Sequence, residues 1–440
     1  MTIEEKVLDR IRPTVDEDVS LQEAARSILK AIKDDPEVKD CRIEPRLVGS
    51  VAKGTHLRGT DLDMFLIFPK EHPFERLVSC CSRLGTELLE DKEERFADHP
   101  YVHGKYKGQE VDLVPCYEMD PGERVRSAVD RSPLHTEHIM GEMMPCHKDE
   151  ARLLKAFMKG IGVYGADSKT RGFSGYLSEL LVIHYGGFLA TLEEARAWSA
   201  GLSIGVEDSE RDDGSPLMVP DPVDPRRNVA SALHIDSFAL MVHASASYLM
   251  QPDERFFFPA PRKDMDREEV EMIVDRRGCR MLSVTFEVAL MSEDNLHSQG
   301  HKTLNGLRQM LERKGFPVLR CIYHLDSEMH LLFELESDSL PPVELHDGPP
   351  IWMRNSSDFL EKWRGSELGE PFIEQGRWRV HRRREHLEAA DCLLNGINEV
   401  SLGAGLDPVN MVVRGHTFTM RDAPLTGLTA LLDTRMPWEI

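Results

Sequence analysis

The stretch Asp61-Leu62-Asp63, followed by five apolar residues at 64–68, constrains the fold of this chain more than any other feature. An unbroken apolar run of this length is typical of a strand that is buried on both faces. Side chains alternate between the faces of a strand, so both carboxylates would project the same way. Two acids at the mouth of a buried strand are costly unless a positive charge meets them. A lone Asp-x-Asp pair is more often a solvated strand end, so the neighbouring residues must decide.

The neighbourhood of this pair favours a metal site. Gly49-Ser50 follows a strand-like stretch at 43–48, at a point where the chain would turn into a helix. Glycine lets backbone N–H groups approach a phosphate closely, and a helix N-terminus favours anions. A third acid, Asp112, lies in a second strand-like run at 110–114, which Pro115 would close. Three carboxylates from two strands beside such a turn predict a two-metal phosphoryl-transfer site with Mg²⁺ as the ion.

The composition indicates a large globular chain without a membrane segment. With 440 residues, of which 41% are hydrophobic, it can form two to four domains. No apolar run approaches the ~18 residues that a membrane-spanning helix needs, and residues 1–10 lack the apolar centre of a signal peptide. Eight cysteines without a C-x-x-C pair argue against a zinc site and for reduced thiols, so we expect a cytoplasmic protein.

The formal net charge of −22 argues against nucleic-acid binding by the surface as a whole, but charge is a local property. One dense basic run surrounds Trp378. It is either a solvated face with acidic neighbours or a phosphate-binding segment, and the segment alone leaves both interpretations open. The run consists of Arg377, Arg379, His381, Arg382, Arg383 and Arg384.

The hydrophobic pattern predicts a multidomain α+β chain. Ser20 and Glu23 fit a capping box, so a first helix would begin there and end at Asp35-Pro36. Two later strands would form a hairpin at Gly108. The further elements that we expect are strands at 43–48, 62–68, 101–107 and 110–114, and a helix from about 74 to 89.

Changes in this pattern divide the chain into four predicted domains. Residues 1–145 form a small α/β domain, and residues 146–258 are mostly helical. Residues 259–350 have the order strand–helix–strand–strand of a ferredoxin-like body, and residues 351–440 form a mixed α/β tail. The aromatic signature of sequence-reading RNA-recognition motifs is absent, so this body by itself predicts no RNA binding.

Seven segments spread over the catalytic, central and tail regions carry a family resemblance. The chain resembles the class I (archaeal) CCA-adding enzymes, the tRNA nucleotidyltransferases of the polymerase-beta superfamily. The nucleotidyltransferase signature alone would indicate only the superfamily, and the fifth and sixth segments make the match specific. The segments are GSVAKGTHLRGTDLDMFLIFP, HPYVHGKYKGQEVDLVPCY, SAVDRSPLH, ARLLKAFMKGIGVYGA, RGFSGYLSELL, DPVDPRRNVA and PFIEQGRWRV.

The resemblance implies a template-independent polymerase that adds C, C and A to the 3′ end of tRNA from CTP and ATP. Residues 1–145 would then be a polymerase-beta-like catalytic domain, and residues 146–258 would bind nucleotide and primer. Asp61, Asp63 and Asp112 would hold two Mg²⁺ ions, and pyrophosphate would leave. The tail would bind tRNA through Arg377, Arg382, Arg383 and Arg384, and the acceptor stem would be read through backbone and shape. The family also suggests a homodimer.

The same resemblance assigns nucleotide-contacting residues. Gly49 and Ser50 would bind the triphosphate, with Lys53 as a weaker candidate, and His135, Lys155 and Tyr164 would contact the nucleotide. Arg227 would read the incoming base through its planar donor fork. Asp98 and His99 would lie near the primer end, whereas His103 remains an unassigned strand histidine. Simpler interpretations are a solvated helix position for Lys155, a core position for Tyr164 and a salt bridge within the loop 221–224 for Arg227.

Two other functions remain open from the sequence. The chain could be another enzyme of the superfamily, such as a poly(A) polymerase, an oligoadenylate-synthetase-like enzyme or a small-molecule nucleotidyltransferase, because the signature residues are the same. It could also be a non-enzymatic RNA-binding protein with an inactive catalytic domain. The presence of all three acids argues against such decay.

Overall fold

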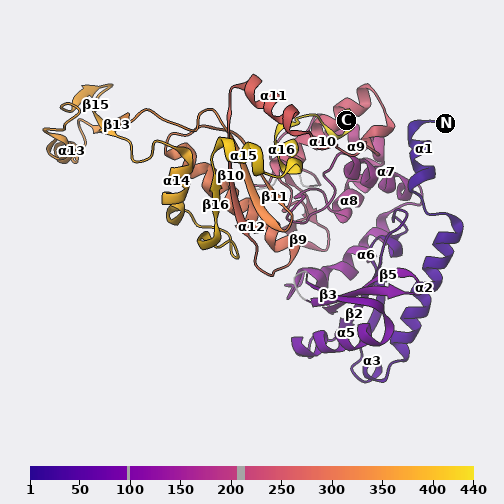
Figure 1. The fold of residues 1–440 in the computed structure, drawn as a ribbon. Coiled ribbons are helices and arrows are strands. Elements are labelled where there is room, and N and C mark those ends of the chain that lie inside the picture. Colours follow the sequence, from indigo (N-terminus) through magenta and orange to yellow (C-terminus); the bar gives the residue numbers. More distant parts are fainter. Residues whose placement is uncertain (97–99, 206–213) are drawn as a thin grey trace. The chain divides into compact units, whose positions relative to one another are not determined.

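The computed structural model describes residues 1–96, 100–205 and 214–440, which form two compact units (Figure 1). Unit 1 comprises residues 1–262 and 435–440, and unit 2 comprises residues 263–434. The predicted primer-end residues Asp98 and His99 lie outside the described residues. Among the helices described, none has both the length and the apolar composition that crossing a membrane needs.

Unit 1 begins with two helices, α1 (Ile3–Ile11) and α2 (Val15–Asp34), and each is opened by a Thr-x-x-Glu capping box. The box at the start of α2 is formed by Thr14 and Glu17. The predicted start at Ser20 is therefore wrong, because an equivalent motif six residues earlier begins the helix and leaves Ser20 inside it. The predicted end at Asp35-Pro36 is confirmed, since α2 ends at Asp34 and the short helix α3 (Pro36–Asp40) follows.

A five-stranded sheet forms the centre of the N-terminal region, in the order β1-β2-β5-β4-β3. The inner strands β2 and β5 run parallel to each other, and the other neighbouring pairs run antiparallel. Helix α5 (Phe74–Leu88) connects β2 to β3, close to the predicted bounds. The strands are β1 (Glu44–Val48), β2 (Leu62–Phe68), β3 (Glu90–Phe96), β4 (Pro100–Tyr106) and β5 (Gln109–Tyr117).

Two features of this sheet differ from the sequence-based expectation. Strand β3 was not predicted, because its charged sequence EDKEERF lacks the apolar alternation of a half-buried strand; it lies at the edge of the sheet. Strand β5 does not close at Pro115 but continues to Tyr117. The pairing of β5 with β4 ends at Leu113. Pro115 lies beyond that point, so the N–H that it lacks on the β4 side breaks no hydrogen bond between the two strands.

The rest of unit 1 is mainly helical and packs around an aromatic core. In the contacting pairs of this core, the ring centroids lie 5.4–5.9 Å apart. The rings are those of Phe157, Phe188, Tyr248, Phe256 and Phe257. The helices are α4 (Gly49–Lys53), η1 (Ala128–Arg131), α6 (Ser132–Glu142), α7 (His147–Gly160), α8 (Gly175–Tyr185), α9 (Phe188–Ala195), α10 (Ile235–Met250), η2 (Glu254–Phe256) and η5 (Pro437–Glu439). Short strand pairs are formed by β6 (Leu202–Ser203) with β7 (Leu217–Met218) and by β8 (Pro220–Asp221) with β9 (Asp224–Asn228).

Unit 2 contains the expected strand–helix–strand–strand order in β10 (Arg280–Glu287), α12 (Glu293–Arg313), β11 (Val318–Leu325) and β12 (Glu328–Leu335). These strands form a sheet in the order β11-β12-β10-β16, whose last strand, β16 (Val412–Arg414), comes from near the end of the chain. A separate three-stranded sheet has the order β13-β15-β14 and consists of β13 (Val343–Pro350), β14 (Phe372–Glu374) and β15 (Arg377–Arg383). The helices are α11 (Arg267–Arg277), α13 (Ser356–Trp363), α14 (Ala389–Gly396), η3 (Ile397–Glu399), η4 (Pro408–Asn410), α15 (His416–Asp422) and α16 (Leu425–Leu432).

Two helical glycines provide a test of the packing of unit 1. A Cβ at Gly160 in α7 would lie 2.1 Å from the carbonyl oxygen of Phe256, whereas a Cβ at Gly141 in α6 would meet nothing within 4 Å. We expect Gly141→Ala to raise the free energy of unfolding by about 0.5–1 kcal/mol, because alanine favours a helix over glycine. We expect Gly160→Ala to lower the free energy of unfolding by about 1–3 kcal/mol, because the backbone at Phe256 must move to admit the methyl group. Urea unfolding followed by circular dichroism measures both, and equal effects of the two changes would contradict this packing.

Candidate active site

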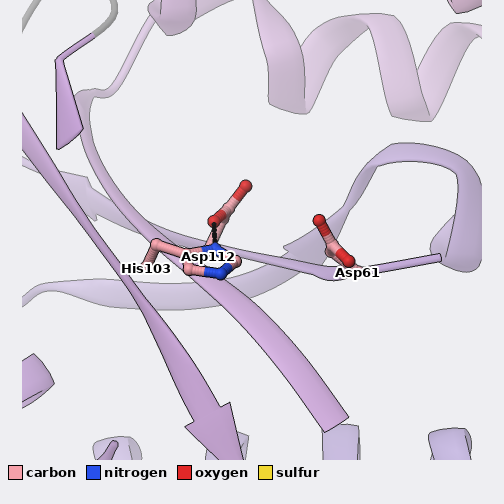
Figure 2. A group of neighbouring side chains, drawn as sticks. All are labelled: Asp61, His103 and Asp112. Atoms are coloured by element: carbon pink, nitrogen blue, oxygen red, sulfur yellow. Dashed lines mark hydrogen bonds and ion pairs between the residues drawn. The ribbon is translucent and has the colours of Figure 1, made fainter. Parts of the chain in front are cut away.

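Strands β2 and β5 bring the predicted acids together. Their parallel register places Asp63 opposite Asp112, and Asp61 immediately precedes β2. Carboxylate oxygens of Asp61 and Asp112 and a ring nitrogen of His103 all lie within 4.8 Å of one another. Figure 2 shows these three side chains. Carboxylate oxygens are the ligands that Mg²⁺ prefers, so the two acids of this group fit such an ion.

The acids strongly affect one another. Burial, and then the negative charge of Asp112, raise the pKa of Asp61 above its ordinary value. The same two causes raise the pKa of Asp63 to about 7. Partly buried carboxylates this close together are unfavourable without a nearby cation, and a divalent ion between them would remove the repulsion.

His103 is a site residue to which the sequence assigned no role. It lies on β4, as expected for a strand histidine, and its Nδ1 is 2.6 Å from Oδ1 of Asp112. Its Nε2 lies 3.2 Å from a carboxylate oxygen of Glu110. The tight turn at Gly108 pairs Tyr106 with Gln109, and counting back along the hairpin puts His103 opposite Asp112. The predicted hairpin therefore contained a signal that could have found this contact.

The turn at Gly49 is built around the second acid. Gly49 has a φ of +72°, and a Cβ there would lie 1.9 Å from Oδ2 of Asp63. Its N–H donates a hydrogen bond to the hydroxyl oxygen of Thr136 in α6 at 3.2 Å. Only glycine can adopt this conformation cheaply and also leave room for the carboxylate. Gly49 and Ser50 are the first residues of α4, a helix of five residues.

Four of the predicted residues line one pocket of about 210 Å³. Ser50 and Asp61 come from the N-terminal region, whereas Lys155 and Tyr164 come from the helical region that follows it. Lys159 also lines this pocket. The pocket therefore combines Ser50 from the turn after β1, one of the grouped acids and two lysines. This combination suits a polyanion that carries a metal ion.

Lys155 and Lys53 are both buried and share one partner. The Nζ atoms of Lys53 and Lys155 each lie 2.6 Å from an oxygen of Glu179 in α8, and Glu179 is wholly buried. The simpler interpretation of Lys155 as a solvated helix lysine is therefore wrong. Sequence reasoning missed Glu179. The available signal was a charged residue within the mainly apolar run 177–183, because such a residue requires a partner once it is buried.

A second polar cluster surrounds Asp221, which is fully buried. It lies 2.8 Å from Nε2 of His135 and 3.0 Å from Nη1 of Arg227, and the hydroxyl of Tyr176 donates to it at 3.2 Å. The rings of His135 and Tyr176 stack with centroids 3.9 Å apart. Burial alone would raise the pKa of Asp221, but the hydrogen bond from His135 holds it at about 2. The salt bridge considered for Arg227 is thus present, and 31% of its side chain remains exposed.

The basic run of unit 2 lies on and just after β15, and its arginines have acidic neighbours. Arg383 and its partner Glu367 are both about two-thirds exposed, with exposed fractions of 67% and 68%. Exposed pairs of this kind are weak and exchange easily for other anions. The pairs are Arg377 and Arg379 with Asp347, Arg379 with Glu374, Arg382 and Arg384 with Glu344, and Arg383 with Glu367.

Three family models match consecutive parts of the chain. Residues 25–135 match the nucleotidyltransferase domain, and residues 149–258 match the second domain of tRNA nucleotidyltransferases. Residues 277–415 match the C-terminal domain of the CCA-adding enzyme.

Curated relatives cover nearly the whole chain. The CCA-adding enzyme of Methanoregula boonei is 37% identical over 415 residues, which are 92% of this chain and 88% of that protein. The chain belongs to the CCA-adding enzymes. The corresponding protein of Archaeoglobus fulgidus is 37% identical over 85% of this chain and 84% of its own length. That of Methanothermobacter thermautotrophicus is 38% identical over 88% of this chain and 86% of its own length. The enzyme is therefore a tRNA nucleotidyltransferase that adds CCA, with the predicted α+β fold and nucleotidyltransferase domain. This resolves the alternatives of another superfamily enzyme and of a non-enzymatic RNA-binding protein.

The contact between Gly49 and Asp63 can be tested with a matched glycine. Gly108 has a similar φ of +79°, but a Cβ there would meet nothing within 4 Å. Alanine at either position meets the same backbone cost, but only Gly49→Ala displaces the Asp63 carboxylate. We expect Gly49→Ala to lower kcat/KM for CCA addition by about 100-fold or more, as for other small displacements of reacting groups, and Gly108→Ala to leave it nearly unchanged. Similar activities for the two variants would show that the fit of Asp63 against the turn is unimportant.

Proposed function

We propose that this enzyme adds C, C and A one at a time to the 3′ end of tRNA, uses CTP and ATP as donors and releases pyrophosphate. No nucleic-acid template would be needed, since the pocket and the RNA end select the base together. One observation carries the proposal: Asp61, whose carboxylate is grouped with that of Asp112, lines the same pocket as Ser50, Lys155 and Tyr164.

We assign Asp61, Asp63 and Asp112 as the ligands of two Mg²⁺ ions. The grouped oxygens of Asp61 and Asp112 support this assignment, and so does the mutual repulsion that Asp63 shares with both. When bound, the ions would lower the pKa of the attacking hydroxyl and offset charge on the phosphates. His103 would orient the Asp112 carboxylate from outside, as partners of metal ligands generally do.

In the reaction, the 3′-hydroxyl of the tRNA attacks the α-phosphorus of the bound nucleotide in line. The new O–P bond forms as the bond to the β-phosphate breaks, and the electron pair leaves with pyrophosphate. Ser50 would hold phosphate oxygens through its hydroxyl and backbone N–H. Tyr164 and Lys155 would contact the nucleotide in the same pocket, and Lys53 would contribute positive charge from behind it.

Base selection is assigned to Arg227, with His135 as a second nucleotide contact. Asp221 fixes both side chains, and a guanidinium held on one side still presents a planar fork of donors on the other. Cytosine O2 and N3 or adenine N1 can accept from such a fork. A fixed fork excludes bases that would leave its donors unpaired.

We further propose the roles of the four predicted domains. Residues 1–145 would catalyse, residues 146–258 would bind nucleotide and primer, and residues 259–350 would form the body that carries the tRNA-binding tail at 351–440. Asp98 and His99 stay assigned to the primer end. We expect a cytoplasmic homodimer; the eight cysteines are all free, as a reducing compartment favours.

Removal of the metal and of one ligand tests this chemistry on tRNA that lacks its terminal CCA. We expect EDTA to abolish incorporation of CTP and ATP, and excess Mg²⁺ to restore it. Asp112→Asn should lower kcat by about 10³-fold, which corresponds to the several kcal/mol that metal-ion catalysis supplies.

Glu118→Gln is the control, because this exposed acid directly follows the same strand. It should keep full activity. Mn²⁺ binding by the CTP complex, measured by electron paramagnetic resonance, should weaken only in Asp112→Asn. An Asp112→Asn enzyme with the parent rate would remove this residue from the metal site.

The basic run can be tested through the exposed pair of Arg383 and Glu367. If Arg383 contacts tRNA phosphate, Arg383→Gln should weaken binding and reduce the salt slope by about one unit. Glu367→Gln should strengthen binding, because it removes the competing carboxylate, and should keep the slope. Fluorescence anisotropy between about 50 and 200 mM KCl measures both. If neither change alters binding, the run is a solvated face with acidic neighbours.

A further inference from the structure

Glu179 is an ionised group that the proposed reaction does not yet use. Its Oε2 accepts from Nζ of Lys53, and its Oε1 accepts from Nζ of Lys155, each at 2.6 Å. The hydroxyl of Thr55 also donates to Oε1. Nζ of Lys155 lies 3.0 Å from the hydroxyl oxygen of Thr55 and 3.3 Å from its carbonyl oxygen. One carboxylate from α8 therefore joins α4, α7 and the loop after α4.

This network carries more positive than negative charge. All four of its side chains are at least nine-tenths buried, with exposed fractions of 8%, 0%, 2% and 0% for Lys53, Thr55, Lys155 and Glu179. Burial alone would raise the pKa of Glu179, but Lys155 and Lys53 hold it below its ordinary value, so the carboxylate is ionised. Burial lowers the pKa of Lys155, whereas its ion pair with Glu179 favours the charged form. With both lysines charged, the two lysines and one glutamate carry a net charge of +1. A buried excess charge is costly unless it serves an anion nearby.

The network borders the nucleotide pocket directly. Lys155 lines this pocket together with Ser50, Asp61 and Tyr164. The start of α8 lies close to the same groups, since a Cβ at Gly175 would be 2.8 Å from the hydroxyl of Tyr164 and 3.8 Å from Cε of Lys155. The excess positive charge therefore lies where the phosphates of a nucleotide would be bound.

Helix α7 also holds the loop that leads to Asp61. Arg152, less than one turn before Lys155, donates to the carbonyl oxygens of Gly54 at 2.7 Å and His56 at 2.8 Å. Lys155 holds Thr55 between these two points. The position of Lys155 is thus coupled to the loop that lines the pocket and ends at the first acid.

We propose that Glu179 is a positioning residue for the nucleotide triphosphate, which holds Lys53 and Lys155 in place so that their excess charge faces the β- and γ-phosphates. This inference rests on the proposed assignment of the pocket to the triphosphate. A negative charge beside a phosphate would by itself weaken binding. The contribution of Glu179 is therefore geometric: it orders two flexible side chains before the nucleotide arrives and removes that cost from binding.

Glu179→Gln separates geometry from charge, because the amide keeps the shape of the side chain but cannot hold two ammonium groups. We expect KM for CTP and for ATP to rise by the same factor, about tenfold, since the triphosphate is common to both. KM for tRNA should not change. The inhibition constant of CMP should stay within about twofold of the parent value, because CMP lacks the β- and γ-phosphates. A purely structural role would weaken CMP and CTP alike and would overturn the proposal.

The double change Lys53→Met/Glu179→Gln is the matched control for charge. It keeps the net charge of +1, now from Lys155 alone, but leaves Lys155 without its anchor. We expect its KM for CTP to remain raised, whereas recovery to the parent KM would show that only net charge matters. If Glu179→Gln does not fold by circular dichroism, the double variant takes its place with the same CTP and CMP comparison.

An unchanged or lowered KM for CTP in a folded Glu179→Gln enzyme would also overturn the inference. Failure of the underlying pocket assignment would look different. In that case the parent enzyme itself would bind CTP no better than CMP, whatever residue stands at position 179.

Discussion

The parallel pairing of β2 with β5 is the constraint on which the site depends. It places Asp63 opposite Asp112 and brings Asp61, which directly precedes β2, close to Asp112. Acidic side chains are therefore forced together where burial already penalises their charge. Folding alone gives no reason for such an arrangement, which is unfavourable until a cation enters it. The surrounding features follow from this crowding: the glycine at position 49 makes room for one carboxylate, and His103 holds another.

The turn after β1 and the helical region of unit 1 together provide the opposite charge. Lys53 and Lys155 lie buried around Glu179, on the border of the pocket that also contains Asp61. A magnesium nucleotide has both signs of charge, with a cation near the α-phosphate and an anionic tail. In the proposed assignment the acids would serve the first and the lysines the second. Neither group of charges is stable by itself, and each is held by side chains from neighbouring elements.

Arginines in this acidic protein are accompanied by carboxylates wherever a role in binding was expected. Arg227 is fixed by the buried Asp221, and 31% of its side chain stays exposed. The arginines of β15 have partners on β13, β14 or the segment between them, and Arg383 and Glu367 are both largely exposed. A rigid buried pair suits selection of a base, whereas an exposed pair suits exchange with tRNA phosphates. The net charge of −22 is thus compatible with local anion binding.

Alternation, apolar runs and turn residues act over a few positions, so local sequence was enough to predict several elements. These are the strands at 44–48 and 62–68, the helix at 74–88, the hairpin at Gly108 and the acids on and beside β2 and β5. Local sequence did not determine the start of α2, where two equivalent capping motifs competed, or the charged edge strand β3. Tertiary structure alone decided the partners of the charges. Glu179 meets a lysine 126 residues away, and Asp221 meets a histidine 86 residues away. Such pairs form because burial forces each ionised group to find an opposite charge, and which one lies within reach depends on how whole elements pack.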